Sequence, residues 1–283
     1  MLVLLVLAAL VTAGSPLRRA LGLALALPVF ALPFLATSVM ARAILAAAAF
    51  WGCARLVDLA REPRPLPPLH RAVHVLAIVD SRRVTWTGPR LDPKWLGRAA
   101  LAGAAAYLSL WAAHTLAPDG GPLRWLAGLV FMYSFAELLA GLLHTLGHLL
   151  GAEFPPVHRH PILARSLRDF WGERWNLPVN RWLRQHCFVP LARRGRAGLG
   201  LALAFAVSVA LHAWIVAVAL DAEMVARTAA FFALQGALLG AEGPLKVARW
   251  PRPLGRAWAL AGTIVPSPLF TEPMLRMFAE LVR

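Results

Sequence analysis

The sequence predicts an all-α protein, a polytopic transmembrane bundle of about eight spans with interfacial helices in two cytoplasmic loops. Of its 283 residues, 59% are hydrophobic and only 15% are charged, and the mean hydropathy is +0.62. The apolar residues fall in long runs, which an ordinary soluble domain does not show. Because a hydrocarbon core about 30 Å thick needs about 20 apolar residues per helix, each run is a candidate span.

Taken in order along the chain, the runs predict the following spans: residues 2–14, 20–36, 39–60, 99–117, 123–150, 198–220, 224–244 and 255–272. The first run has no basic segment before it, and Arg18 and Arg19 follow it. We therefore favour an uncleaved first span over a signal peptide. Together the runs predict one membrane-embedded domain over residues 1–283.

The positions of Lys and Arg predict the orientation of these spans, since loops rich in them stay on the cytoplasmic side. With eight spans and an outside N-terminus, the basic residues collect in the inside segments 18–19, 61–98, 159–196 and 246–256. The net charge of +15 is then explained by contact with anionic lipid headgroups, and no nucleic-acid partner is expected. We expect a multi-pass protein of the bacterial cytoplasmic membrane, and the sequence does not indicate its oligomeric state.

Two of the predicted cytoplasmic segments have features beyond those of simple connections between spans. Glu62–Pro68 in the first is rich in proline, which predicts a rigid extended stretch, and Leu69–Val79 has the spacing of an interfacial helix. The second, the basic loop 151–197, interleaves arginines with aromatic residues that favour the headgroup region or the interior of the bundle; these aromatics are Phe170, Trp171, Trp175 and Trp182. The alternative is a loop that fixes topology without chemistry.

His212 is the one ionisable residue in the apolar run 198–220. At 1.5 Å per residue it lies roughly 20 Å from the cytoplasmic end of that span. An ionisable side chain at this depth indicates function and needs a partner, for which Ser208 is one turn away. A desolvated imidazole is neutral and can accept a hydroxyl proton as a general base. The alternative is a structural histidine bonded to a neighbouring helix.

Other histidines raise the possibility of a metal site, but there are too few of them, and no His-His pair, for the clusters of membrane di-iron enzymes. No metal is therefore expected, and Cys53 and Cys187 indicate neither a disulfide framework nor a cysteine-based metal site. The histidines concerned are His144 and His148, four residues apart on one helix face, followed by His158 and His160.

Three segments together resemble the wax synthase branch of the membrane-bound O-acyltransferase family. They are His160-Pro-Ile, then Ser166-Leu-Arg-Asp-Phe-Trp-Gly-Glu-Arg-Trp-Asn176, and then Ser208-Val-Ala-Leu-His212. The resemblance extends from about residue 35 to the C-terminus. It implies transfer of a fatty acyl group from acyl-CoA to a hydroxyl, with His212 as the catalytic residue and Asn176 as the second signature position.

The resemblance also implies where the substrates bind. We expect acyl-CoA as a co-substrate with no other cofactor, a lipophilic alcohol as acceptor, and membrane lipids as partners. The sequence departs from the family pattern at Glu173, where arginine is common, and at Ala213, where glutamate is common. A metal-dependent lipid hydroxylase or desaturase and a non-catalytic lipid transporter remain as alternatives. The side chains expected to contact substrate are Arg168, Trp171, Arg174, Trp175 and Arg181.

Overall fold

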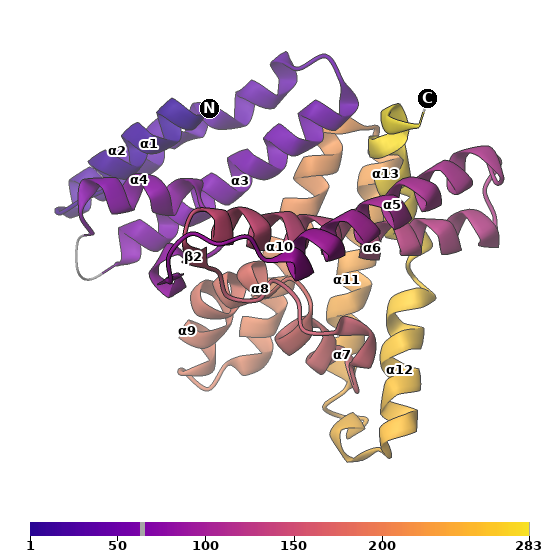
Figure 1. The fold of residues 1–283 in the computed structure, drawn as a ribbon. Coiled ribbons are helices and arrows are strands. Elements are labelled where there is room, and N and C mark those ends of the chain that lie inside the picture. The colour runs from indigo at the N-terminus through magenta and orange to yellow at the C-terminus, as the bar shows by residue number, and fades with distance from the viewer. Residues whose placement is uncertain (63–65, 283) are drawn as a thin grey trace. The chain divides into compact units, whose positions relative to one another are not determined.

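The computed structural model describes residues 1–62 and 66–282, and its regular structure is almost entirely helical (Figure 1). The predicted all-α class is confirmed. The chain packs as two compact units, which we call unit 1 (Met1–Val84) and unit 2 (Thr85–Arg283). One membrane-embedded domain over residues 1–283 stays a prediction.

Unit 1 is built from helices whose ends are set by serine caps and prolines. Ser15 and Ser38 accept hydrogen bonds from the backbone amides of Arg18 and Ala41, which satisfies orphan donors at two helix starts. Part of the predicted extended stretch Glu62–Pro68 lies outside the described residues. The elements are α1 (Leu2–Val11), α2 (Pro16–Ala26), the 3-10 segment η1 (Leu27–Leu35), α3 (Val39–Arg61), α4 (Pro68–Leu76) and the 3-10 turn η2 (Ser81–Arg83).

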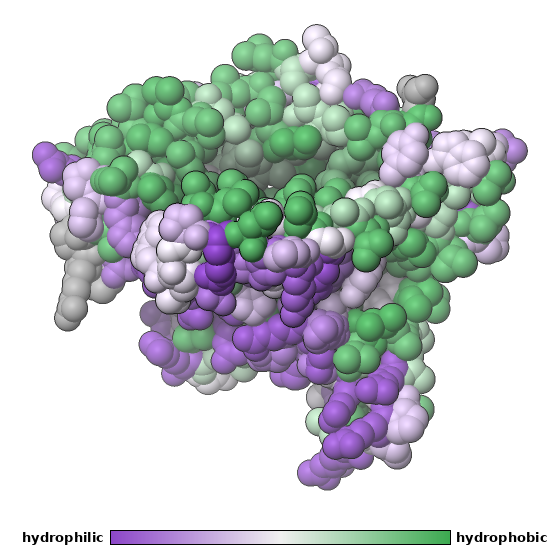
Figure 2. All heavy atoms as spheres, viewed as in Figure 1, coloured by the Kyte–Doolittle hydropathy of each residue, from purple (hydrophilic) through white to green (hydrophobic). Residues whose placement is uncertain are grey.

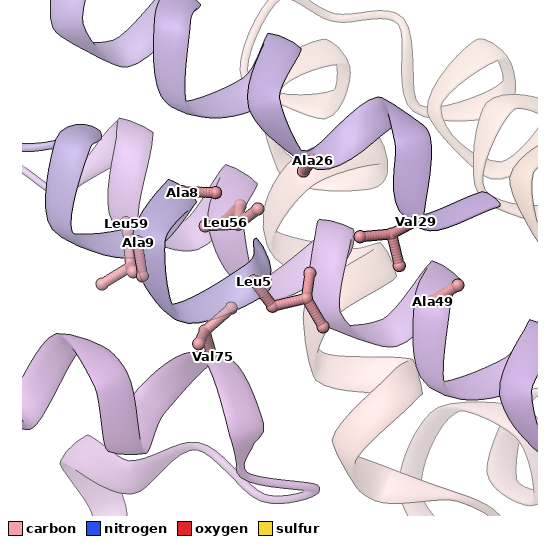
Figure 3. Packing of buried hydrophobic residues seen from close by; sticks show 9 residues of the cluster. All are labelled: Leu5, Ala8, Ala9, Ala26, Val29, Ala49, Leu56, Leu59 and Val75. Carbon is pink, nitrogen blue, oxygen red and sulfur yellow. The ribbon is translucent and has the colours of Figure 1, made fainter. Parts of the chain in front are cut away.

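Small residues let the helices of unit 1 approach closely. An added Cβ at Gly52 of α3 would lie 2.6 Å from a methyl group of Leu5 on α1, so only glycine fits there. Arg71 of α4 is 3% exposed and its Nε donates to the carbonyl of Ala9 at 2.9 Å, which satisfies an orphan acceptor at the end of α1. The apolar core is shown in Figure 3 and consists of Leu5, Ala8, Ala9, Ala26, Val29, Ala49, Leu56, Leu59 and Val75.

Unit 2 contains two long consecutive helices, α5 and α6, then the basic loop, and then a second group of helices that begins with α10 and α11. The two short strands pair antiparallel, with Thr85 opposite Glu153. The elements are β1 (Thr85–Trp86), α5 (Pro93–Thr115), α6 (Pro122–Leu149), β2 (Ala152–Glu153), η3 (Pro161–Leu163), α7 (Leu167–Asp169), the π-helical η4 (Phe170–Arg174), α8 (Leu177–Leu183), the π-helical η5 (Arg184–Phe188), α9 (Val189–Ala192), α10 (Ala197–Ala219), α11 (Ala222–Ala241), η6 (Val247–Arg249), α12 (Arg252–Ile264), α13 (Pro268–Phe278) and η7 (Ala279–Leu281).

Helices α5, α6 and α13 pack around an apolar cluster that includes Phe131 and Leu275. A Cβ on Gly141 of α6 would lie 2.9 Å from Cβ of Ala99 on α5, so the two backbones meet at this glycine. Nε of Arg124 lies 2.8 Å from Oε2 of Glu272, and both residues are buried. A buried charge needs such a partner, and this pair joins α6 to α13.

Five helices of the described residues are long and apolar enough to cross a membrane, so the protein is an integral membrane protein. The expected number of about eight is not confirmed. The first run forms only the ten-residue α1, about 15 Å long. The five are Pro16–Leu35, Val39–Arg61, Pro122–Leu149, Ala197–Ala219 and Ala222–Ala241.

The predicted span 255–272 is wrong as a single helix. The structure divides it into α12 and α13 with a turn between Ile264 and Pro268. Pro266 explains the break, because proline lacks the amide hydrogen of a helix interior and disfavours helical backbone in the residue before it. Two short helices replace one span at this place.

Hydrophilic residues of unit 2 gather over α7, α8 and α9 and over the turn that joins α11 to α12 (Figure 2). This turn carries Lys246 and Arg249, and α12 begins with Arg252. In unit 1, the amphipathic stretch expected at Leu69–Val79 is helical as α4. That these segments lie at a membrane interface stays a prediction.

Candidate active site

The basic loop folds around a carboxylate at its centre. Oδ1 of Asp169 accepts a hydrogen bond from Nε of Arg174 at 2.9 Å, and Oδ2 accepts one from the amide of Arg165 at 3.0 Å. The guanidinium of Arg174 also donates to the carbonyls of Arg159 and His160. Arg174, which we expected to contact substrate, therefore holds two parts of the loop together.

A buried glutamate fastens this loop to the helices. Glu242, at the end of α11, is 5% exposed. Its carboxylate accepts hydrogen bonds from the amides of Leu167 at 2.6 Å and Arg168 at 3.1 Å and from Nε1 of Trp258 at 2.9 Å. The carboxylate thus satisfies the free amides at the start of α7, and it joins α11, α12 and the loop at one point.

Gln235 of α11 makes a second link between the loop and the helices. This side chain is fully buried; its Oε1 accepts from Nε1 of Trp171 at 3.0 Å, and its Nε2 donates to the carbonyl of Gly262 at 2.8 Å. The indole of Trp171 also packs against Phe205 and Phe232, with ring centroids 6.5 and 6.1 Å apart. Trp171 is therefore a loop residue inserted between α10 and α11.

The ring of His212 also packs on Phe232. The two rings stack with centroids 3.8 Å apart, and Phe270 of α13 meets the imidazole edge to face at 5.8 Å. Nδ1 lies 2.8 Å from the carbonyl oxygen of Ser208, so the partner is the backbone of Ser208 rather than its hydroxyl. Because a carbonyl only accepts, Nδ1 carries the hydrogen and Nε2 presents a lone pair.

Asn176 lies at the start of α8 in a left-handed conformation with φ 42°. Its amide donates to Nδ1 of His158 at 3.1 Å, and its carbonyl accepts from the amide of Asn180 at 2.9 Å. The His158 ring packs on the indole of Trp175, with centroids 4.7 Å apart. Asn180 in turn donates from its side chain to the carbonyl of Trp171. Asn176 and Trp171 therefore belong to one hydrogen-bonded turn.

The remaining basic side chains of the loop differ in exposure. The side chain of Arg168 is exposed and Arg181 is half-buried. Glu173, at the position where the family commonly has arginine, lies on the surface 3.9 Å from Nη1 of Arg184. Arg168 is therefore the predicted contact residue most open to a charged substrate group.

Three of the four histidines that raised a metal alternative contact other residues. His144 stacks on Trp95 at 4.0 Å, Nε2 of His148 lies 3.2 Å from Nη2 of Arg90, and His158 accepts from Asn176 as described. Within residues 1–62 and 66–282, no three His, Cys, Asp or Glu side chains are grouped so as to hold a metal ion.

Gln235, Glu242 and Asn180 were missed by the sequence-based analysis. Gln235 could have been found, because an uncharged polar residue inside the apolar run 224–244 needs a buried partner in a membrane. Glu242 lies in the same run and carries a charge that is costly there unless paired. Asn180 gives no comparable signal, since polar residues are ordinary in a basic loop.

Comparisons with known proteins confirm the resemblance. Residues 154–234 match the model of the Membrane bound O-acyl transferase family, a segment that includes Asn176, His212 and Phe232. The match covers the basic loop, α10 and most of α11. The site just described therefore lies mainly within the segment that the family shares.

Curated relatives come from plants. The chain is 34% identical over 125 residues to the Arabidopsis thaliana protein named probable long-chain-alcohol O-fatty-acyltransferase 1, which covers 41% of this chain and 36% of the relative. A second Arabidopsis relative of the same kind, number 2, is 34% identical over 145 residues, covering 48% of this chain and 42% of the relative. The long-chain-alcohol O-fatty-acyltransferase of Simmondsia chinensis is 32% identical over 107 residues, 35% of this chain and 30% of the relative.

The matches span about two fifths of the length of the first of these relatives. Because the relatives are plant proteins, they give no support to the expected bacterial cytoplasmic membrane. Their printed names describe acyl transfer to long-chain alcohols.

We expect acid to loosen the turn around Asn176. Burial lowers the pKa of the His158 imidazole below its ordinary value of 6.5, so the unfolded chain binds more protons than the folded one as the pH falls below 6.5. The stability that His158 contributes is present above pH 6.5 and is lost as the pH falls through the lowered pKa. Thermal unfolding in detergent between pH 7.5 and pH 5 will measure this loss.

The matched variant for this test is His158→Gln, whose amide oxygen can accept from Asn176 and does not titrate. It will show a smaller fall in melting temperature over the same pH range. An equal fall in both proteins would contradict the role given to His158.

Proposed function

We propose that the chain is a membrane O-acyltransferase that transfers a fatty acyl group from acyl-CoA to the hydroxyl of a lipophilic alcohol. The observation that carries this proposal is the contact of the His212 Nδ1 with the Ser208 carbonyl at 2.8 Å, which in a neutral ring leaves the lone pair on Nε2. The family match over residues 154–234 supports the same class of reaction.

His212 acts as a general base on the acceptor alcohol. Nε2 takes the hydroxyl proton while the oxygen bonds to the thioester carbonyl carbon, and the tetrahedral intermediate then expels the CoA thiolate, which recovers the proton from His212. The products are an ester and free CoA, with no acyl-enzyme. The two phenylalanine rings against the imidazole keep water from hydrating it and favour the neutral form that the reaction needs.

The donor and acceptor reach this centre from different surroundings. The CoA phosphates are assigned to the basic loop, where Arg168 is exposed and arginine binds phosphate in a bidentate manner. The fatty chains of donor and alcohol are assigned to the apolar space among the spans. The side-chain amide of Asn176 is the donor that we assign to the oxyanion of the intermediate.

Replacement of His212 tests the catalytic assignment. General-base catalysis contributes about 10²- to 10⁴-fold, so His212→Ala will lower kcat for ester formation by a factor in that range. Ester products are measured by mass spectrometry after incubation with labelled acyl-CoA and a panel of alcohols. His160→Asn, a loop variant compatible with the left-handed backbone at that position, serves as the control and will keep its activity. Normal turnover by His212→Ala rejects the assignment.

Asn176→Gly separates the chemistry of the amide from the shape of the turn. Glycine accepts the positive φ of this position without strain, and the backbone amide that donates to His158 is retained. We expect an unchanged melting temperature with a kcat lowered by about 10²- to 10³-fold, the effect typical of removing one oxyanion donor. A variant that folds and turns over normally would limit Asn176 to a structural role.

The assignment of Arg168 to the CoA phosphates is tested by how the reaction rate depends on the concentration of acyl-CoA. Arg168→Gln removes a charge and leaves in place the backbone amide that binds Glu242. We expect a higher KM for acyl-CoA at nearly unchanged kcat, with the effect reduced at high salt. Arg227→Gln removes an equal charge from an exposed ion pair on α11 and is the matched control. The same KM for both variants and for the natural chain would mean that Arg168 does not contact the donor.

A further inference from the structure

Unit 1 holds a serine, a histidine and an aspartate in line. Nδ1 of His74 lies 2.9 Å from Oγ of Ser81, and Nε2 of the same ring lies 3.4 Å from Oδ2 of Asp58. His74 is fully buried, Asp58 is 3% exposed, and Ser81 is half-buried at the start of η2. These three side chains come from α3, α4 and η2 and take no part in the site of unit 2.

The neighbours of the ring decide where its hydrogen lies. The Asp58 carboxylate only accepts, so the hydrogen of a neutral imidazole is placed on Nε2, which lies 3.4 Å from Oδ2 of Asp58 and makes no hydrogen bond in the described structure. Nδ1 then carries the lone pair and accepts from the Ser81 hydroxyl. This is the starting arrangement of a serine nucleophile with its base and orienting carboxylate, which is recognised by geometry and roles rather than by sequence position.

Surrounding groups fix the carboxylate and the serine turn. Nη1 of Arg55, which is 2% exposed, pairs with Oδ2 of Asp58 at 3.0 Å. Nη2 of Arg55 donates to the carbonyl of Ile78 at 2.9 Å, which ties the segment before Ser81 to α3. Asp80 accepts from Nε of Arg82 at 2.8 Å and lies 3.9 Å from Nδ1 of His74.

Apolar side chains are exposed in the segment that precedes Ser81. Leu69, Val73 and Leu76 lie at helical spacing on the face of α4 away from His74, and Ile78, three residues before Ser81, has 57% of its surface exposed. Arg83, in the same turn as Ser81, has a side chain 58% exposed. A substrate with a long acyl chain and a polar ester group matches such a boundary between apolar and cationic surface.

We propose that Ser81, His74 and Asp58 form a second catalytic site, a serine hydrolase site for a fatty acyl ester or thioester. Oγ of Ser81 bonds to the acyl carbonyl carbon as its proton passes to Nδ1 of His74, and the alcohol or thiol leaves with that proton. Water then attacks the acyl-serine, gives a proton to Nδ1, and releases the fatty acid as the proton returns to Oγ. The guanidinium of Arg83 is assigned to the oxyanion.

The test uses the purified full chain in detergent with an alkyl fluorophosphonate, which phosphonylates an activated serine. Mass spectrometry of peptides will find the adduct on Ser81. Ser81→Ala will lose it, and Asp58→Asn and His74→Gln will slow its formation by about 10²-fold or more. Hydrolysis of a p-nitrophenyl decanoate ester will fall in the same variants.

Three controls separate this site from folding and from acyl transfer. Ser15→Ala, which removes a helix-capping hydroxyl in unit 1, will keep the label and the hydrolysis rate. His212→Ala will keep both while losing ester synthesis, so the two sites fail independently. Ser81→Ala changes few contacts, and its melting temperature will verify the fold. An unlabelled Ser81 in the folded natural chain, or unchanged hydrolysis in a folded Ser81→Ala variant, overturns the proposal.

Discussion

The site of unit 2 depends on two polar side chains buried in an apolar helix. Gln235, within α11, accepts a hydrogen bond from the indole of Trp171. Glu242, at the C-terminal end of α11, accepts hydrogen bonds from the first amides of α7 and from the indole of Trp258. Each of these donors costs free energy when it is buried without a partner. Pairing with these acceptors therefore favours the observed position of the loop. His212 is placed against the same helix through Phe232.

The same requirement shapes the chemistry at His212. A histidine in an apolar span stays neutral when its surroundings desolvate it, and the carbonyl of Ser208 then selects the tautomer. The aromatic rings of Phe232 and Phe270 fix the plane of the imidazole. A general base for an alcohol needs these properties together, and the span supplies them without a charged partner at the position of Ala213. The departure of this chain from the family pattern at that residue leaves the tautomer unaffected, since the backbone determines it.

Unit 1 provides partners for its buried polar groups in a different way. Its buried polar groups form a chain from Arg55 through Asp58 and His74 to Ser81, so each charge has a partner. Removal of Arg55 or Asp58 leaves the other charge of the pair buried and unpaired, which is costly. This series of polar groups ends at the hydroxyl of Ser81. The contacts that give the buried polar groups their partners therefore also place the hydroxyl next to the base that we propose for it.

The sequence alone determined the all-α class and the approximate positions of three long helices, predicted over 39–60, 123–150 and 198–220 and observed as α3, α6 and α10, because length and hydropathy are local properties. It also determined the family likeness of the loop, since that depends on consecutive residues. Tertiary structure decided that Arg174 turns inwards to Asp169 and that Trp171 pairs with Gln235, 64 residues away. The partner of a buried polar side chain is set by which distant segments pack together, and no local pattern in the sequence encodes that choice.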